Sequence, residues 1–369
     1  MGNRTSLEKM VKTDLLKKAY QGKKVFLTGH TGFKGSWLLL MLHQLGAIVK
    51  GYSLAPVHQN DLYHQINGDN FCDSQIDDIR NQETLIKSMV DFQPDFVIHM
   101  AAQALVIDSY KAPVETYQTN VMGTIHVLEG LRKLNKPCNS IIITTDKVYW
   151  NFERDTPYKE TDQLGGYDPY SNSKAAADIT INSYQKSFFN LDNFEEHQQG
   201  ISTVRSGNVI GGGDMAENRI IPDCVKSLEN NQPISVRNPN AVRPWQHVLD
   251  PLYGYLLLGA KLQEEPKKYS EAFNFGPETE DVNTVKELVE IAIKSWGHGE
   301  ASFPKITNKL HEAGLLKLDI EKAKTQLGWK PQYQAETAIQ KTIEWYKNAK
   351  PNPAEYTLNQ IEEFLATPA

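Results

Sequence analysis

Short apolar runs alternate with longer amphipathic segments along the first half of the chain. β-branched and aliphatic residues fill four runs, at 24–27, 47–52, 96–100 and 140–145. Such runs are typical of strands buried on both faces of a sheet. Apolar residues recur every three or four positions in 116–134, which predicts a helix with one buried face, and helices are also predicted over 37–45 and 171–189. This order predicts a parallel sheet covered by helices.

Three glycines separate the first predicted strand from the first predicted helix. Gly29, Gly32 and Gly35 stand at three-residue spacing in the sequence GHTGFKG. Such a turn brings the backbone close to a pyrophosphate, and the unpaired N–H groups of the helix N-terminus stabilise its negative charge. These elements predict a dinucleotide site in an α/β fold, a Rossmann-type doubly wound parallel sheet. About 20 residues further on, near Ser53, neither a carboxylate nor an arginine is present, so this rule leaves NAD and NADP open.

A tyrosine and a lysine four residues apart form the first catalytic candidate. Tyr170 directly precedes the predicted helix 171–189, and Lys174 lies in it. On a helix, side chains four residues apart lie on the same face. A phenol of pKa about 10 is a poor base near neutrality, and a nearby ammonium group lowers that pKa. The pair can therefore take a proton from a sugar hydroxyl while a hydride leaves its carbon. Thr145, at the carboxyl edge of the predicted sheet, can hydrogen-bond the same hydroxyl.

An acid and a base directly follow this threonine. Hydride transfer alone would need only Tyr170, Lys174 and Thr145, so Asp146 and Lys147 suggest a second reaction, such as an elimination. The alternative is a simple Asp–Lys ion pair that caps the strand.

Composition and charge exclude several classes of function. Apolar residues make up 40% of the 369 residues and charged residues 23%, as in ordinary soluble proteins, and no run approaches the roughly 20 apolar residues of a membrane helix. The net charge of −6 predicts no attraction for nucleic acid or membrane. Cys72, Cys138 and Cys224 are too scattered for a disulfide framework or a zinc pair, so we expect no metal. Residues 1–22 lack the apolar run of a signal peptide, which favours a cytoplasmic location, and we treat the myristoylation pattern at 1–6 as a chance match.

Several long motifs resemble those of a known family. They are GHTGFKGSW from Gly29, HMAAQ from His99, NVMGT from Asn120, GGYDPYSNSK from Gly165, VRSGNVIGGGD from Val204 and RPWQHV from Arg243. Together they span about 25–340. On these motifs the chain resembles the nucleotide-sugar 4,6-dehydratases of the extended short-chain dehydrogenase/reductase family, and most of all the group that acts on CDP-glucose.

The resemblance implies a reaction with no net redox change, in which tightly bound NAD takes a hydride from C4 and returns it to C6. Tyr170, with Lys174 and Thr145, would deprotonate the 4-hydroxyl, and Asp146 would protonate the leaving 6-hydroxyl. Lys147 would either remove the C5 proton, for which it must be neutral, or stay charged and stabilise the enolate.

The resemblance also implies binding residues. For NAD they are Gly29, Thr31, Gly32, Phe33, Gly35, Asp78, Ile79, Ala101, Ala102, Tyr170 and Lys174, and for the nucleotide sugar they are Asn208, Arg219, Arg243 and His247. Arginine suits a diphosphate because its planar fork donates two hydrogen bonds. Ala104 and Ile107 stand where the family carries proline and arginine, a change that can alter the choice of substrate.

Two other functions remain open at this point. A nucleotide-sugar 4-epimerase or reductase on the same fold would keep Thr145, Tyr170 and Lys174 but have little use for Asp146 and Lys147. A dinucleotide-sensing protein without catalysis would be expected to lose the tyrosine or the lysine, and both are present. The resemblance further implies a homodimer formed through the helices 116–134 and 171–189.

The sequence changes character beyond residue 201, where clusters of glycine, proline and arginine indicate a loop-rich, ligand-binding region. We therefore predict four segments: a polar N-terminal leader at 1–22, an NAD-binding Rossmann domain at 23–200, a smaller substrate-binding lobe at 201–350 that is interleaved with the end of the sheet, and a solvated C-terminal tail at 351–369 with one short amphipathic helix.

Overall fold

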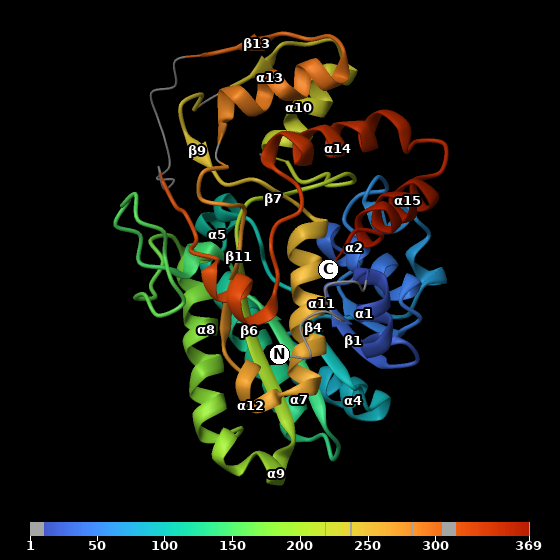
Figure 1. The fold of residues 1–369 in the computed structure, drawn as a ribbon, viewed down its shortest axis with the longest axis vertical. Coiled ribbons are helices and arrows are strands. Elements are labelled where there is room, and N and C mark those ends of the chain that lie inside the picture. Colours follow the sequence, from blue (N-terminus) through green and yellow to red (C-terminus); the bar gives the residue numbers. More distant parts are fainter. Residues whose placement is uncertain (1–10, 218, 237, 282, 305–314, 369) are drawn as a thin grey trace, which may run out of the picture.

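The computed structural model describes residues 11–217, 219–236, 238–281, 283–304 and 315–368. Within these ranges seven parallel strands form one sheet, in the order β11-β6-β5-β4-β1-β2-β3 (Figure 1). They are β1 (Lys24–Thr28), β2 (Ile48–Ser53), β3 (Asp73–Ile76), β4 (Phe96–His99), β5 (Cys138–Ile143), β6 (Gln199–Ser206) and β11 (Ala272–Phe275). The predicted parallel α/β fold is confirmed.

Helices cover both faces of the sheet because its strands are apolar on both sides. In β1, Val25 and Leu27 face one hydrophobic core and Phe26 faces the other. The first core is formed with α2 (Phe33–Gln44) and α11 (Leu249–Glu264), and the second with α4 (Gln82–Phe92), α7 (Gly123–Arg132) and α8 (Pro169–Ser187).

A smaller group of elements lies beyond the carboxyl ends of the strands (Figure 1). Its helices are α10 (Ile220–Glu229), α13 (Val285–Trp296) and α14 (Ala335–Asn348). Two-stranded pairs accompany them: β7 (Val209–Ile210) with β10 (Gln246–His247), β9 (Val242–Arg243) with β12 (Asn283–Thr284), and β8 (Ile234–Ser235) with β13 (Ala301–Ser302). The space between this lobe and the sheet is where a ligand would contact both.

The helix predicted over 116–134 is divided in the structure. It consists of α6 (Pro113–Tyr117), a π-turn at Gln118–Met122 and α7. A π-turn inserts an extra residue into the helix and is often found at functional sites. Just after it, a Cβ on Gly123 would lie 2.5 Å from Ile79 Cδ1, so the helix passes very close to the loop after β3.

The first and the last helix in the described part of the chain both pack on the first core. Helix α1 (Lys12–Tyr20) lies within the segment predicted as a leader, and its Leu16 and Tyr20 are fully buried in that core. Helix α15 (Pro353–Leu365) packs on α2 and buries Ile361 and Phe364, so the prediction of a solvated tail is wrong although its helix is present. The apolar stripe of α15 needs a partner surface, which α2 provides. The myristoylation pattern at 1–6 lies outside the described residues.

No helix within the described ranges is long and apolar enough to cross a membrane.

Candidate active site

A cavity of about 1210 Å³ lies between the carboxyl edge of the sheet and the lobe. Nearly all of the predicted site residues line it, from both parts of the chain. They are Gly29, Thr31, Gly32, Phe33, Gly35, Asp78, Ile79, Ala101, Ala102, Thr145, Asp146, Lys147, Tyr170, Lys174, Asn208, Arg219 and Arg243. The fold therefore brings together candidates that lie more than 200 residues apart in the sequence.

The glycine turn has no room for side chains at two of its three positions. Gly29 has a φ of +76°, and a Cβ on it would lie 2.7 Å from the Ala101 nitrogen. A Cβ on Gly35 would lie 2.0 Å from the Gly29 oxygen. Gly32 differs, because its Cβ would make only an ordinary contact of 3.5 Å. Gly32 is exposed at the N-terminus of α2, so the first-turn N–H groups of that helix can reach an anion in the cavity. This end of the cavity fits a pyrophosphate.

The neighbouring end of β2 has hydroxyl groups in place of a carboxylate. Thr31 Oγ1 donates to the Leu54 carbonyl at 2.8 Å and lies 2.9 Å from Ser53 Oγ. Further along the cavity, Asp78 forms an ion pair of 2.6 Å with Arg80, and this hydrogen bond lowers the pKa of Asp78. Ile79 is buried beside it.

Helix α8 presents Tyr170 and Lys174 to the cavity. It begins at Asp168, whose Oδ1 accepts a hydrogen bond of 2.9 Å from the Ser171 nitrogen. One turn later, Lys174 Nζ donates to the Ile143 carbonyl at 2.8 Å. Burial, together with the positive charge of Lys34, lowers the pKa of Lys174 to about 8. Burial raises the pKa of Tyr170 to about 12, although the Thr145 hydroxyl opposes this rise. The phenol is therefore neutral near pH 7 and needs a further positive charge to act as a base.

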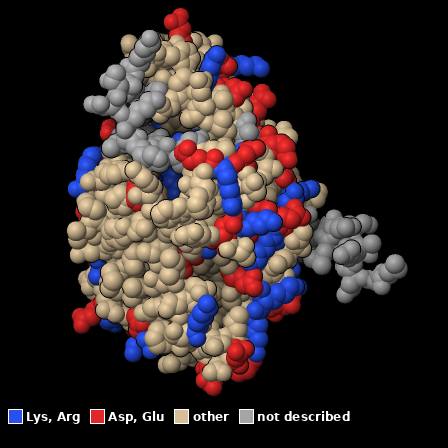
Figure 2. Space-filling model, turned by 90° about the vertical axis from the view of Figure 1, so that its left-hand side faces the viewer, with Lys and Arg blue, Asp and Glu red and all other residues tan. Residues whose placement is uncertain are grey.

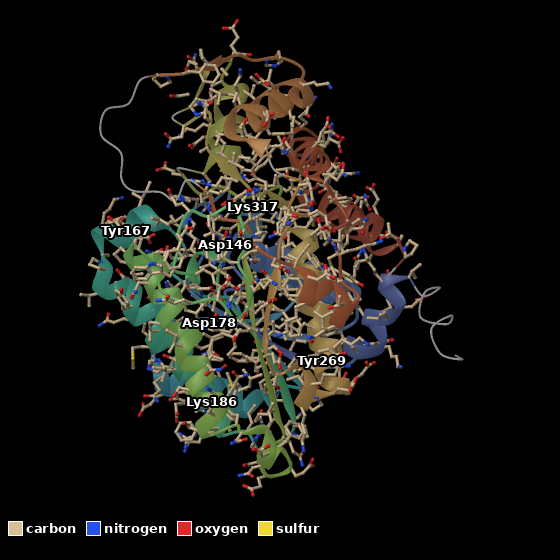
Figure 3. The ribbon with its side chains drawn as sticks, turned by 60° about the vertical axis from the view of Figure 1, so that its left-hand side comes forward. Asp146, Tyr167, Asp178, Lys186, Tyr269 and Lys317 are labelled. Atoms are coloured by element: carbon tan, nitrogen blue, oxygen red, sulfur yellow. The ribbon has the colours of Figure 1, made fainter. Side chains whose placement is uncertain are left out.

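Asp146 lies close to Tyr170, near the middle of the molecule in Figure 3. It is buried, and its Oδ1 accepts a hydrogen bond of 2.9 Å from Thr145 Oγ1. Gly207 allows this position, because a Cβ there would lie 2.1 Å from Asp146 Oδ2. Lys147 Nζ lies 6.0 Å from the centre of the Tyr170 ring and forms no ion pair with Asp146. The structure therefore contradicts the alternative that Asp146 and Lys147 form an ion pair that caps the strand.

Asn120, in the π-turn, does not line the cavity but is buried behind it, and no role was assigned to it from the sequence. Its Oδ1 accepts from the Gln103 nitrogen at 2.9 Å, and its Nδ2 donates to the Gln103 carbonyl and to Ser173 Oγ. Asn120 thus connects the loop after β4 with α8 beside Tyr170. It lies within the quoted NVMGT motif, so the signal was in the sequence.

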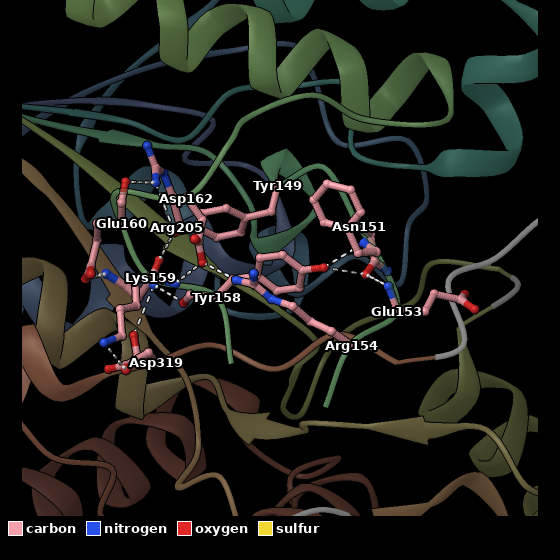
Figure 4. Close-up of polar contacts among 12 residues, drawn as sticks. Tyr149, Asn151, Glu153, Arg154, Tyr158, Lys159, Glu160, Asp162, Arg205 and Asp319 are labelled. Atoms are coloured by element: carbon pink, nitrogen blue, oxygen red, sulfur yellow. Dashed lines mark hydrogen bonds and ion pairs between the residues drawn. The ribbon is translucent and has the colours of Figure 1, made fainter. Parts of the chain in front are cut away.

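A buried polar network holds the catalytic segment from behind. Arg205, on β6, forms two hydrogen bonds of 2.8 and 2.9 Å with Asp178 of α8. Its Nη1 donates to Tyr149 Oη at 2.9 Å, and Tyr149 follows Asp146 by three residues in the sequence. Tyr149 donates in turn to Asn274 of β11 at 2.7 Å. Figure 4 shows the part of this network around Tyr149, Tyr158 and Arg205. The hydrogen bonds of Arg205 tie α8, β6 and the segment after β5 into one unit.

Arginine side chains line the lobe side of the cavity. Arg219 forms an ion pair of 2.8 Å with Asp214, and Arg243 donates to the Val242 carbonyl at 3.0 Å. Asn208 and Ile107 also line the cavity. This wall combines cationic and neutral hydrogen-bond donors, which suits a diphosphate.

The prediction that His247 binds the nucleotide sugar is wrong. Its ring is fully buried, does not line the cavity, and packs edge-on against Trp37 and Tyr333. Val248 N–H bonds to the Ile210 carbonyl and continues the register of β10 with β7, and this register turns His247 toward the core. Burial lowers the pKa of His247 to about 3, so the ring is neutral.

Comparisons with known proteins agree with this site. The family model for GDP-mannose 4,6 dehydratase matches residues 26–342. The CDP-glucose 4,6-dehydratase of Salmonella typhimurium is 47% identical over 331 residues, which cover 90% of this chain and 92% of the relative.

Solved structures share the fold. An epimerase of Methanothermobacter thermautotrophicus has a TM-score of 0.78 at 21% identity, covering 93% of this chain and 97% of its own. The dTDP-glucose 4,6-dehydratase DesIV of Streptomyces venezuelae, solved with NAD bound, has a TM-score of 0.75 at 23% identity, covering 88% of this chain and 98% of its own. The family model and the relative from Salmonella typhimurium confirm the resemblance found in the motifs, and the chain belongs to the nucleotide-sugar dehydratase family that the GDP-mannose 4,6 dehydratase model describes.

Proposed function

We propose that the protein is a CDP-glucose 4,6-dehydratase that uses NAD. The observation that carries the proposal is the position of Asp146 and Lys147 in the same cavity as Thr145, Tyr170 and Lys174. An epimerase or a reductase needs the last three groups only. The 47% identity to a CDP-glucose 4,6-dehydratase supports the choice of nucleotide.

NAD fits the cavity on the side of the sheet. The glycine turn and the N-terminus of α2 would hold its pyrophosphate, and Asp78 and Ile79, which line the same cavity, would contact its adenosine. Ala101 and Ala102 would lie against the ribose on the nicotinamide side. Bound NAD would supply a hydride acceptor and donor and a positive charge near Tyr170.

The side chains of this protein would carry out the proton transfers. Tyr170 would accept the proton of the sugar 4-hydroxyl, held by Thr145, because a nearby positive charge favours its phenolate. Lys174 would stay beside it, fixed by the Ile143 carbonyl. Asp146 would give a proton to the 6-hydroxyl as water leaves, from its buried position close to Tyr170.

Lys147 has two possible tasks at C5. As a neutral amine it would remove the C5 proton, and as an ammonium it would stabilise the enolate that forms next to the new ketone. The substitution Lys147→Arg separates these tasks, because arginine keeps the charge but cannot act as a base near neutrality. Loss of C5 exchange in that variant supports the base, and retention supports the charge.

Arg219, Arg243 and Asn208 would bind the diphosphate and the nucleotide from the lobe. Ile107 would contact the substrate where the resembling family carries an arginine. We infer that the loss of this cation is compensated by Arg219 and Arg243, which line the same cavity.

Incubation with nucleotide sugars in D₂O tests the proposed function. The purified protein, with NAD, is given CDP-glucose, dTDP-glucose, UDP-glucose or GDP-mannose in separate reactions, each followed by mass spectrometry and NMR. Loss of one water from CDP-glucose, with one deuterium gained at C5, is the expected result. Dehydration of a different nucleotide sugar would overturn the choice of nucleotide, and a 4-epimer or a reduced sugar would overturn the elimination.

We also propose a homodimer formed through α8 and its neighbours. Three large apolar side chains are exposed on these elements: Val114 of α6, Met122 of the π-turn and Ile179 of α8, with exposed fractions of 69%, 44% and 53%. Figure 2 shows this side of the molecule, where a broad area carries few charged side chains. Such an exposed apolar face is typical of an interface. A second copy, which presents the same helices, would cover it.

A further inference from the structure

Lys34 is a cavity residue that the proposed mechanism does not use. It lies in the first turn of α2, between Gly32 and Gly35, and its side chain lines the cavity. The helix dipole disfavours a cation at this end of a helix, and removing an amine from water disfavours its charged form. The folded protein would therefore be more stable with an apolar side chain at this position, so we infer that the lysine has a function other than stabilising the fold.

Its contacts hold the ammonium group without neutralising it. Lys34 Nζ donates to Tyr255 Oη at 3.2 Å and lies 5.3 Å from the centre of that ring. Tyr255 is fully buried in α11, and its hydroxyl lies 2.5 Å from Ser206 Oγ at the end of β6. Lys34 forms no ion pair with any residue in the described part of the chain.

The ammonium group is thereby held near the catalytic candidates. Ser206 precedes Gly207, the residue that touches Asp146. The ionisable groups that interact with Lys34 come from four other elements: Asp146 after β5, Lys174 of α8, Arg219 before α10 and Tyr255 of α11. Asp146 is the one carboxylate among these groups. Burial and Arg219 lower the pKa of Lys34 to about 8, so near neutral pH it is charged.

We propose that Lys34 is a positioning residue of the dehydration, which places a second positive charge beside Lys174 and so favours the loss of one proton from the Tyr170–Lys174 pair. The inference rests on the proposed function. A like charge raises the free energy of the protonated pair, and Lys34 is the largest cause after burial of the lowered pKa of Lys174. The glycine turn would in this way serve the proton transfer as well as the cofactor.

Two substitutions separate the charge of Lys34 from its size. Lys34→Met keeps the length of the side chain and removes the charge, and Lys34→Arg keeps the charge. We expect the acid limb of the pH profile of kcat for CDP-glucose to move upward by about one pH unit in the methionine variant and to stay in place in the arginine variant. Lys12→Met is the matched control, because Lys12 is also a buried lysine of lowered pKa but lies under Tyr253 and Phe364, outside the cavity.

A second measurement needs no turnover. Competitive acetylation at a series of pH values, followed by mass spectrometry of the Lys174 peptide, gives the pH at which half of this amine is reactive. This midpoint should rise by about one unit in Lys34→Met and remain unchanged in Lys34→Arg and Lys12→Met. An unchanged midpoint in Lys34→Met would overturn the inference, as would an equal shift in Lys12→Met. A shifted midpoint in a protein that dehydrates no nucleotide sugar would support the charge coupling and reject the proposed function.

Discussion

Single side chains in the cavity are assigned to different steps, so their tasks can be tested one at a time. Tyr170 and Lys174 come from one helix, and Asp146 and Lys147 come from the end of β5. Removal of one group should therefore stop one step and leave the earlier steps running.

Asp146→Asn should block the loss of water but not the events at C4 and C5. The amide cannot give the 6-hydroxyl a proton, so we expect dehydration to slow by about 10²- to 10⁴-fold. In D₂O, recovered CDP-glucose should meanwhile gain deuterium at C5. Mass spectrometry measures both. If exchange and dehydration fall by the same factor, Asp146 acts before the elimination and its assigned task is wrong.

Gly207→Ala should have a similar effect by displacing Asp146. The added Cβ would lie 2.1 Å from Asp146 Oδ2, so the carboxylate must move. A misplacement of about 1 Å can reduce a rate by about 10²-fold. Gly276→Ala is the matched control, because its Cβ would meet nothing closer than 3.6 Å. Steady-state rates of both variants give the comparison, and equal rates would contradict the close approach.

At the scale of elements, the position of Tyr170 depends on how α8 begins. Asp168 caps the helix through the Ser171 nitrogen and also accepts a 2.6 Å hydrogen bond from Ser171 Oγ. Asp168→Ala should lower the free energy of unfolding by about 1 kcal/mol, whereas Asp168→Asn, which keeps a capping oxygen, should lower it less. Urea denaturation of the three proteins tests this order. Equal stabilities would show that Pro169 and packing alone define the start of α8.

Elements made of continuous apolar residues were predictable, and those with polar interiors were not. β1, β4 and β5 were found because their residues are aliphatic or β-branched. β6 is buried along its whole length, yet its sequence is QGISTVRS. Its polar groups are satisfied by partners distant in the chain: Gln199 donates to the Lys136 carbonyl, and Arg205 binds Asp178. The local sequence of a strand does not indicate such distant partners.

The candidate site followed the same rule. The glycine turn and Thr145 were predicted from the residues themselves, because a parallel sheet gathers such groups at its carboxyl edge. Asn208, Arg219 and Arg243 were expected only from the family resemblance, since they come from short strands and loops of the lobe. His247 was assigned wrongly, because the direction of a side chain in the two-residue strand β10 is set by its pairing with β7. Lys34 could not be assigned a role from the sequence, because nothing in the sequence shows that its amine reaches Tyr255.

At the scale of the whole molecule, three buried histidines predict acid lability. Burial lowers the pKa of His30 to about 4 and of His99 and His247 to about 3, from 6.5. The unfolded chain therefore binds protons that the folded protein excludes, so stability is full above pH 6.5 and falls as the pH drops below that value. Each ring should reduce the free energy of unfolding by on the order of 2 kcal/mol between pH 7 and pH 5.

Urea denaturation at a series of pH values measures this slope. His247→Phe removes one titrating group, so the loss of stability between pH 7 and pH 5 should shrink by on the order of 2 kcal/mol although the variant is less stable at pH 7. A slope that is the same in both proteins would mean that His247 does not titrate on unfolding.

The proposed dimer is tested at the same scale. Ile179→Glu places a charge on the exposed apolar face and should convert the dimer to monomer in sedimentation equilibrium. Val57→Glu is the control, since Val57 is also exposed, at 83%, but lies in the loop after β2. A wild-type protein that sediments as a monomer would reject the interface.

The buried pair of Arg205 and Asp178 restricts how this protein can change over evolutionary time. Loss of either partner leaves a charge in the interior, at a cost of about 3–5 kcal/mol, which is a large part of the stability of most proteins. Neither position can then drift alone, and in related chains we expect the two to be replaced together or not at all. The substitutions accepted in α8 at Asp178 and in β6 at Arg205 should therefore be correlated.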